Sequence, residues 1–171
     1  KDIGDEYKVS GYPTIKFFPK GEDKTPINYE GGRTEEDFVK FLNEKCGKQR
    51  LVGGLLSEEA GKISELEALV VKFNNAPGKT EISKIIVESQ AIADKLNTRF
   101  VKIHISPAHY YVKIMNKIVE KDDYAVNEIA RLDKIIKSGT ISGSKIDDFT
   151  IRKNILSGFH KDGDKITHEE L

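Results

Sequence analysis

The sequence predicts an α+β chain in two parts, a β-hairpin with one helix followed by an all-α region of five helices. Two observations predict the first part: a proline opens an apolar strand after a Gly-aromatic pair, and residues 14–46 follow a strand, strand, helix order. The second part is predicted by apolar residues that recur at helical spacing in five successive segments.

The first strand begins at Pro13, because proline has no amide donor and suits the first residue of a strand. Residues 14–18 are rich in strand formers, and their alternation places Ile15 and Phe17 on one face. A turn over residues 19–26 then leads into a second short strand at residues 27–30.

The helix of the first part is expected to begin at Thr34, whose hydroxyl can accept a free amide of the first turn. Three carboxylates follow it and suit the positive end of the helix dipole. Gly31-Gly32 breaks the preceding strand, and Gly47 ends the helix.

Four regions follow from this pattern: residues 1–46, a linker at 47–56 that contains Gly53-Gly54, a helical domain at 57–159, and a polar tail at 160–171 that is expected to be disordered. The first of the five helices is predicted to stop at Pro77-Gly78, and the second to start at Thr80. The third has Pro107 in its first turn. The fourth runs from about Asp122 to Lys137, and Ser144 caps the fifth. Leu96 and Val119 are counted among the apolar faces of these helices. Residues 100–105 alternate more like a strand.

The stretch from Val9 to Gly21 resembles the cis-proline strand of a thioredoxin domain, and residues 1–46 resemble the second half of a catalytic domain of protein disulfide isomerases. The resemblance implies that Tyr12 and Pro13 line a groove where an extended substrate pairs with the backbone. It also implies that Arg33 approaches a buried cysteine and lowers the pKa of that cysteine. The alternative for Arg33 is a solvated residue before a helix cap.

The first half of such a domain, with its Cys-x-x-Cys helix, has no counterpart in this chain. Because the chain holds one cysteine, Cys46, no catalytic pair can form within it, and we expect no catalytic residue in the chain itself. Cys46 is interpreted as a structural or free thiol, which would become a nucleophile only beside a histidine. Since it also lacks a Met start, the chain is expected to be a fragment of a longer precursor.

A second resemblance begins in the helical region. The residues that carry it are 110–121, 123–124, 128–132 and 149–156. They resemble the C-terminal helical domain, or D domain, of the endoplasmic reticulum protein 29 family, over roughly residues 57–159. The resemblance implies a role in handling client proteins rather than a reaction.

Composition and spacing argue against other functions. Lys and Arg number 28, as do Asp and Glu, so the chain has no basic field for nucleic acid. No apolar run suits a membrane span. The histidines, His104, His109, His160 and His168, lack the spacing of a helical metal pair, and the glycine pairs suit turns better than a phosphate loop. We therefore expect neither a metal nor a cofactor.

The last four residues, His168, Glu169, Glu170 and Leu171, resemble the Lys-Asp-Glu-Leu retention signal. They predict the lumen of the endoplasmic reticulum, with a retention receptor as partner; the alternative is an acidic end of no significance. Disulfide chemistry fits that oxidising compartment.

The leading hypothesis is the C-terminal fragment of a protein disulfide isomerase that acts on unfolded or disulfide-bonded client proteins. The alternative is a redox-inactive escort or chaperone with a cysteine-free thioredoxin domain. A Cys-x-x-Cys pair upstream of Lys1 would favour the enzyme, and its absence the escort.

Overall fold

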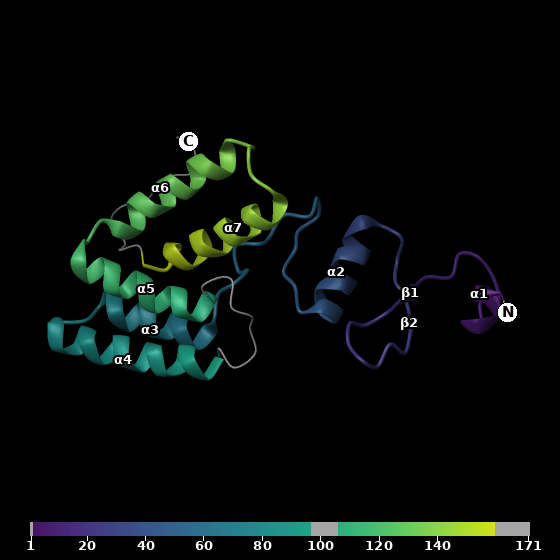
Figure 1. The fold of residues 1–171 in the computed structure, drawn as a ribbon, viewed down its shortest axis with the longest axis horizontal. Coiled ribbons are helices and arrows are strands. Elements are labelled where there is room, and N and C mark those ends of the chain that lie inside the picture. Colours follow the sequence, from purple (N-terminus) through teal and green to yellow (C-terminus); the bar gives the residue numbers. More distant parts are fainter. Residues whose placement is uncertain (1, 97–105, 160–171) are drawn as a thin grey trace. The chain divides into compact units, whose positions relative to one another are not determined.

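The computed structural model describes residues 2–96 and 106–159, which form two compact units that divide between Leu55 and Leu56 (Figure 1). The elements are, in chain order, α1 (Ile3–Glu6), β1 (Lys16–Phe17), β2 (Ile27–Asn28), α2 (Glu35–Cys46), α3 (Ser64–Asn74), α4 (Lys79–Leu96), α5 (Pro107–Glu120), α6 (Tyr124–Lys137) and α7 (Gly143–Ser157). The strand-like stretch 100–105 and the tail 160–171 lie outside the described residues.

The first unit contains the predicted hairpin. Strands β1 and β2 are antiparallel, with Lys16 opposite Asn28 and Phe17 opposite Ile27. The Lys16 ammonium donates across the pair to Asn28 Oδ1 at 2.6 Å. Each strand has two residues, which is shorter than predicted, because a lone pair of strands has no further neighbours to extend its ladder. Helix α1, four residues long, was not predicted.

The cap of α2 confirms the prediction for Thr34. Its hydroxyl accepts the amide of Asp37 at 3.3 Å, and the Asp37 carboxylate accepts the amide of Thr34 at 3.2 Å, so both partners satisfy a free donor. Gly47 ends the helix in the left-handed conformation, with φ of 58°, as expected for a glycine that follows a helix.

Aromatic rings join α2 to the hairpin. The ring of Tyr29 stacks on Phe38 at 4.8 Å and meets Phe41 edge-on at 4.9 Å, while Phe17 approaches Phe41 at 5.8 Å. Even so, no described residue of the first unit is fully buried, and Ile15, predicted to share a face with Phe17, stays 37% exposed. The first unit therefore has only a partial core.

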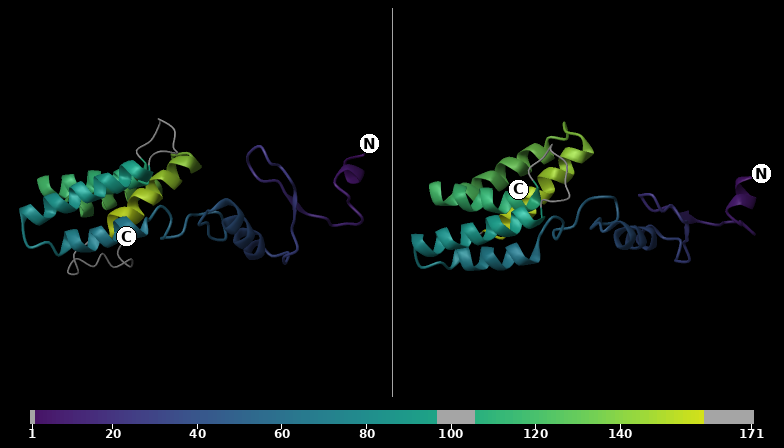
Figure 2. Two further views of the ribbon diagram at one scale, coloured as in Figure 1. Left: turned by 90° about the horizontal axis from the view of Figure 1, so that it is seen from below. Right: turned by 60° about the horizontal axis from the view of Figure 1, so that its bottom comes forward.

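The second unit is all-helical, as predicted, with α5 at its centre (Figures 1 and 2). Helix α5 contacts α3, α4, α6 and α7, and α6 also packs on α7. Tyr111, Ile114 and Met115 of α5 are 0% exposed. Their side chains meet the buried residues of the other helices, which include Leu66, Val70, Ile85, Leu132, Ile155 and Leu156. The fully buried core of the described residues lies in this unit.

Some predicted details of the helices are wrong. Helix α7 begins at Gly143 after an extended Ser142, so Ser144 lies inside the first turn and is not the cap. Helix α6 begins at Tyr124 rather than Asp122, because the two preceding residues form a turn. Leu96 and Val119 are 44% and 54% exposed, since both lie in the last turn of their helices, beyond the packed part of the face.

Candidate functional site

The Tyr12-Pro13 pair lies in the loop before β1. The peptide bond between the two residues is cis, as the thioredoxin resemblance implies. The Tyr12 side chain is 93% exposed, and the Thr14 hydroxyl donates to the Gly11 carbonyl at 2.6 Å, which closes the loop around the proline. Residues 10–15 are all exposed.

Arg33 lies at the same end of the hairpin as Pro13. The register places residues before β1 opposite residues after β2, and the Tyr29 amide donates to the Ile15 carbonyl at 2.9 Å. The Arg33 side chain is exposed and immediately precedes the Thr34 cap. The structure thus brings the predicted site residues to one end of the hairpin.

Two glycines fix the turn that carries Arg33. A Cβ atom at Gly32 would lie 2.0 Å from Asp37 Oδ2, and one at Gly31 would lie 2.6 Å from the Tyr29 hydroxyl. The Tyr29 hydroxyl donates to the Gly32 carbonyl at 2.6 Å. A Cβ atom at either position would displace one of these two side chains, so glycine suits the turn before Thr34.

Cys46, the only cysteine of the sequence, is the last residue of α2 and is exposed. Dithiol-disulfide exchange needs a second thiol to resolve the mixed disulfide, so Cys46 cannot complete that reaction within this chain. Among the residues that the structure describes, no group of three or more His, Cys, Asp or Glu side chains is arranged to hold a metal ion.

His109 is the one histidine within the described ranges, and it joins two helices. Its Nε2 lies 3.0 Å from Asp94 Oδ1 on α4, and its Nδ1 lies 2.9 Å from the hydroxyl of Ser106. The hydrogen bond with His109 is the main cause that lowers the pKa of the Asp94 carboxyl. From the sequence, this histidine was considered only as a metal ligand, and nothing in the local pattern places Asp94 beside it.

The same three residue types form the hydrolase triad, but their roles here differ. The Ser106 hydroxyl accepts the amide of His109 at 3.3 Å as the N-cap of α5. The imidazole also meets the serine through Nδ1, whereas a triad histidine uses Nε2. The contact is therefore a structural tie between α4 and α5.

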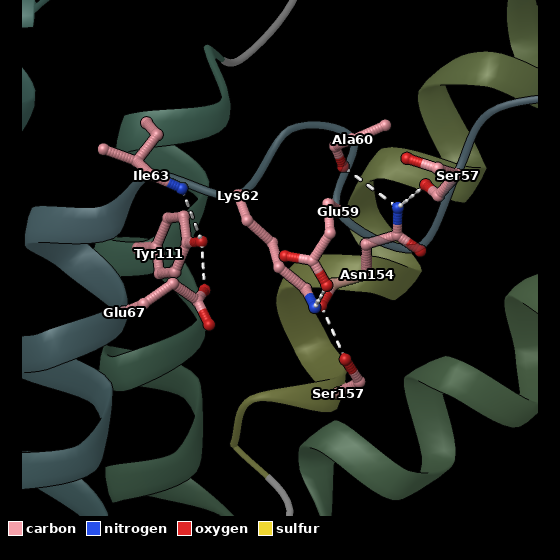
Figure 3. Close-up of polar contacts among 9 residues, drawn as sticks. All are labelled: Ser57, Glu59, Ala60, Lys62, Ile63, Glu67, Tyr111, Asn154 and Ser157. Atoms are coloured by element: carbon pink, nitrogen blue, oxygen red, sulfur yellow. Dashed lines mark hydrogen bonds and ion pairs between the residues drawn. The ribbon is translucent and has the colours of Figure 1, made fainter. Parts of the chain in front are cut away.

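Buried polar side chains bind residues 57–63, the segment that precedes α3 (Figure 3). The Tyr111 hydroxyl donates to the Glu67 carboxylate and accepts the amide of Ile63 at 3.2 Å. Burial, and then the bond to Glu67, raises the pKa of Tyr111. On α7, Asn154 Nδ2 donates to the carbonyls of Ser57 and Ala60 at 2.9 and 3.0 Å. The segment before α3 is thus fastened to α5 and α7.

A further cluster lies between α5 and α7. The Arg152 guanidinium lies 5.5 Å from the ring centre of Tyr110 and 5.9 Å from that of Phe149, and it pairs with Asp148 at 2.9 Å. Burial raises the pKa of Tyr110. These contacts stabilise the helical unit, since Arg152 is itself mostly covered.

The comparisons with known proteins divide the chain as the structure does. Residues 61–159 match the C-terminal domain of endoplasmic reticulum protein ERp29, and residues 1–45 match thioredoxin. Within the described ranges, no helix has the length and apolar character to cross a membrane.

Proteins similar along most of the chain are named as disulfide isomerases. Protein disulfide-isomerase erp38 of Neurospora crassa is 40% identical over 97% of this chain, and protein disulfide isomerase-like 2-2 of Oryza sativa is 42% identical over 93%. Protein disulfide-isomerase 1 of Dictyostelium discoideum is 34% identical over 93%. The chain spans 43%, 41% and 42% of these relatives' lengths. Because the match at residues 61–159 covers more than half of the sequence, the chain belongs to the family that carries the C-terminal domain of ERp29.

Proposed function

We propose that this chain is the C-terminal part of a protein disulfide isomerase of the endoplasmic reticulum lumen. The observation that carries the proposal is the order of the two matches, thioredoxin at residues 1–45 and the ERp29 domain at 61–159, which similar isomerases reproduce over nearly the whole chain. The redox step belongs to a cysteine pair outside these residues, since Cys46 is the only cysteine of the chain.

In the complete reaction, one thiolate attacks a client disulfide and forms a mixed disulfide, with the displaced client sulfur leaving as a thiolate. The second thiolate then attacks the mixed disulfide, which joins the two cysteines of the pair in a disulfide and releases the reduced client as a thiolate. Within this scheme Tyr12 and Pro13 present backbone to an extended client segment, in keeping with the exposed loop before β1. Arg33 supplies a positive charge that favours the thiolate of the second cysteine.

The test compares the 171-residue chain with the longer protein. We expect insulin reduction and the refolding of scrambled ribonuclease only in the longer protein, and we expect both activities to vanish when its cysteine pair is replaced by serine. An upstream sequence without a Cys-x-x-Cys pair would contradict the isomerase proposal and would leave a redox-inactive escort. Activity of the short chain that survives Cys46→Ser would also contradict it.

The proposal includes retention through His168, Glu169, Glu170 and Leu171, which lie outside the described residues. Deletion of these four residues from the longer protein should leave its thermal midpoint unchanged and release the protein into the medium. A control deletion of equal length at residues 160–163 should leave the protein retained. Retention of the protein without its last four residues would contradict the role of the tetrapeptide as an address.

A further inference from the structure

Helix α4 leaves one long face outside the packing of the helical unit. It packs mainly on α3 and α5 (Figures 1 and 2), and its buried residues, Ile85, Ser89 and Ala93, follow one another at intervals of four. Val87 lies midway between Ile85 and Ser89 along the chain and is therefore on the opposite side of the helix. Because Val87 is 70% exposed, the outer face of α4 is open.

A shallow groove of about 660 Å³ lies on this outer face. Among the described residues its lining comes from α4 alone and consists of Thr80, Ser83, Lys84, Val87, Glu88 and Ala91, which we name the α4 face. Val87 is its largest apolar side chain, with the smaller Thr80 two turns before it and the smaller Ala91 one turn after it. A protruding side chain between smaller ones fits the grooves of a facing helix.

Two opposite charges lie on the same flank of Val87. At 100° per residue, Lys84 is rotated about 60° and Glu88 about 100° to the same side of Val87. The Lys84 side chain, 69% exposed, pairs with Glu81 at 3.2 Å, whereas Glu88 pairs with no cation within residues 2–96 and 106–159. Lys84 lies two residues before Ile86 and Glu88 two residues after it, so the charges are symmetric about Ile86.

A two-fold axis at the level of Ile86 makes this arrangement complementary to itself. In two antiparallel helices related by such an axis, residues equally far before and after the axis face one another on the same flank. Lys84 of each copy then meets Glu88 of the other copy, which gives two ion pairs. The two Val87 side chains differ by about 3 Å in height, because each lies one residue beyond the axis.

We propose that two copies of this chain associate through the α4 face, antiparallel and about a two-fold axis beside Val87. The charges favour a second copy as the partner, because the surface carries both members of the ion pair at the spacing that its own two-fold image needs. One helix per copy buries less area than a standard protein interface. We therefore expect a reversible dimer with a Kd of about 100 µM.

Disulfide trapping in the 171-residue chain tests this surface. With Cys46→Ser as the background, Val87→Cys adds the only thiol of the chain. Facing Cα atoms of two closely packed helices lie within the span of a disulfide, so a covalent dimer should form under mild oxidation at about 100 µM protein.

Val71→Cys in the same background is the matched control, because Val71 is a valine of α3 that is 62% exposed. Random collisions trap both variants at similar rates, whereas the proposed dimer predicts trapping about tenfold faster at position 87 than at position 71. Trapping at position 87 that is no faster than at position 71 would overturn the proposal and leave the groove to a partner of another kind.

Charge exchange tests the two-fold pairing itself. In the Val87→Cys background, Lys84→Glu or Glu88→Lys places like charges opposite each other at both contacts, and trapping should become about fivefold slower. An equimolar mixture of the two variants, one of them with an affinity tag, restores opposite charges at both contacts of the mixed dimer. We expect the mixed dimer to form at about the parent rate and to exceed both homodimers. A statistical mixture of the three dimers would overturn the pairing.

Neither readout requires an upstream cysteine pair or the retention signal, so the result is separate from that of the proposed function. The substituted residues of α3 and α4 are all exposed and should leave the fold unchanged. Circular dichroism spectra and thermal midpoints of the reduced variants check this. The comparison within the mixture is also internal, because the same two folded variants form all three dimers.

Discussion

At the scale of single residues, Gly61 shows how close approach and backbone conformation restrict one position. Its φ is 83°, in the left-handed region, and α7 leaves no room for a Cβ atom, which would lie 2.4 Å from Ile151 Cγ2. Gly139 has a similar φ of 66°, but nothing lies within 4 Å of its missing Cβ atom. Substitution at Gly61 and at Gly139 can therefore distinguish the cost of backbone strain from the cost of a steric clash.

We expect Gly61→Ala to lower the free energy of unfolding of the helical unit by about 3 kcal/mol, from left-handed strain and overpacking together. Gly139→Ala should cost about 1 kcal/mol, because only the strain remains. Urea denaturation followed by circular dichroism measures both values. The double variant Gly61→Ala, Ile151→Ala should be less destabilised than the sum of its single variants; strict additivity would show that Ile151 is not the obstacle.

Arg33 tests the proposed thiolate effect in the longer protein. Because its side chain is exposed, we expect Arg33→Ala to change the thermal midpoint little. Loss of the positive charge should raise the pKa of the second cysteine and slow the reoxidation of the enzyme. Arg33→Lys should retain part of the rate, and rapid alkylation across pH measures the cysteine pKa. An unchanged pKa and rate in Arg33→Ala would return Arg33 to the role of a solvated residue.

At the scale of elements, two serines precede helices but differ in what they contribute. The Ser106 hydroxyl accepts the His109 amide at the start of α5, whereas Ser142, before α7, makes no side-chain cap bond. Residue type at the N-cap position is therefore not enough to infer stabilisation.

We expect Ser106→Ala to lower the stability of the helical unit by about 1 kcal/mol, as is typical for the loss of an N-cap. Ser142→Ala should change it by only a few tenths of that amount. Ser106→Asp should restore most of the loss, because its carboxylate can accept the same amide. Chemical denaturation of the three variants provides the comparison, and equal losses for both alanine variants would be inconsistent with the cap assignment.

At the scale of the whole molecule, the two units differ in how much they bury. The helical unit surrounds α5 with fully buried residues such as Ile114 and Leu132. The described part of the first unit has no fully buried residue, and Ile15, Ile27 and Leu42 are 37%, 40% and 46% exposed. A two-stranded hairpin is at best marginally stable without further strands or packing.

We therefore expect residues 57–159 to fold alone and residues 1–46 to remain largely unfolded without the missing half of the thioredoxin domain. Amide hydrogen exchange on the 171-residue chain should show strong protection in α5 and weak protection at Tyr29, whose amide bonds across the hairpin. Adding the upstream half should raise protection at Tyr29 and leave α5 unchanged. Protection of Tyr29 comparable to α5 in the short chain would contradict this expectation.

The sequence was sufficient for features that depend on local pattern. Helix ends are marked by Thr34, Gly47 and Pro107. The reason is local, because the backbone groups that a cap binds, or that proline lacks, lie within one turn of the helix end. The five helices follow from apolar periodicity, which depends on which face meets the core and not on which helix lies opposite. The candidate site at Tyr12, Pro13 and Arg33 came from resemblance, and its role stays a prediction.

Only the tertiary structure decided which distant residues meet. Asn43 and Asn154 look alike in the sequence, yet Asn43 binds the backbone of Arg50. Asn154 instead donates to the carbonyls of Ser57 and Ala60, before α3. Likewise, the partners of Tyr111 and His109 are 44 and 15 residues away. A sequence pattern reports the local preference of a segment, whereas these contacts depend on how helices pack. Gly53 and Gly54 predict a flexible linker by composition, but side chains of α2 bind the backbone of Arg50 and Gly53 within it.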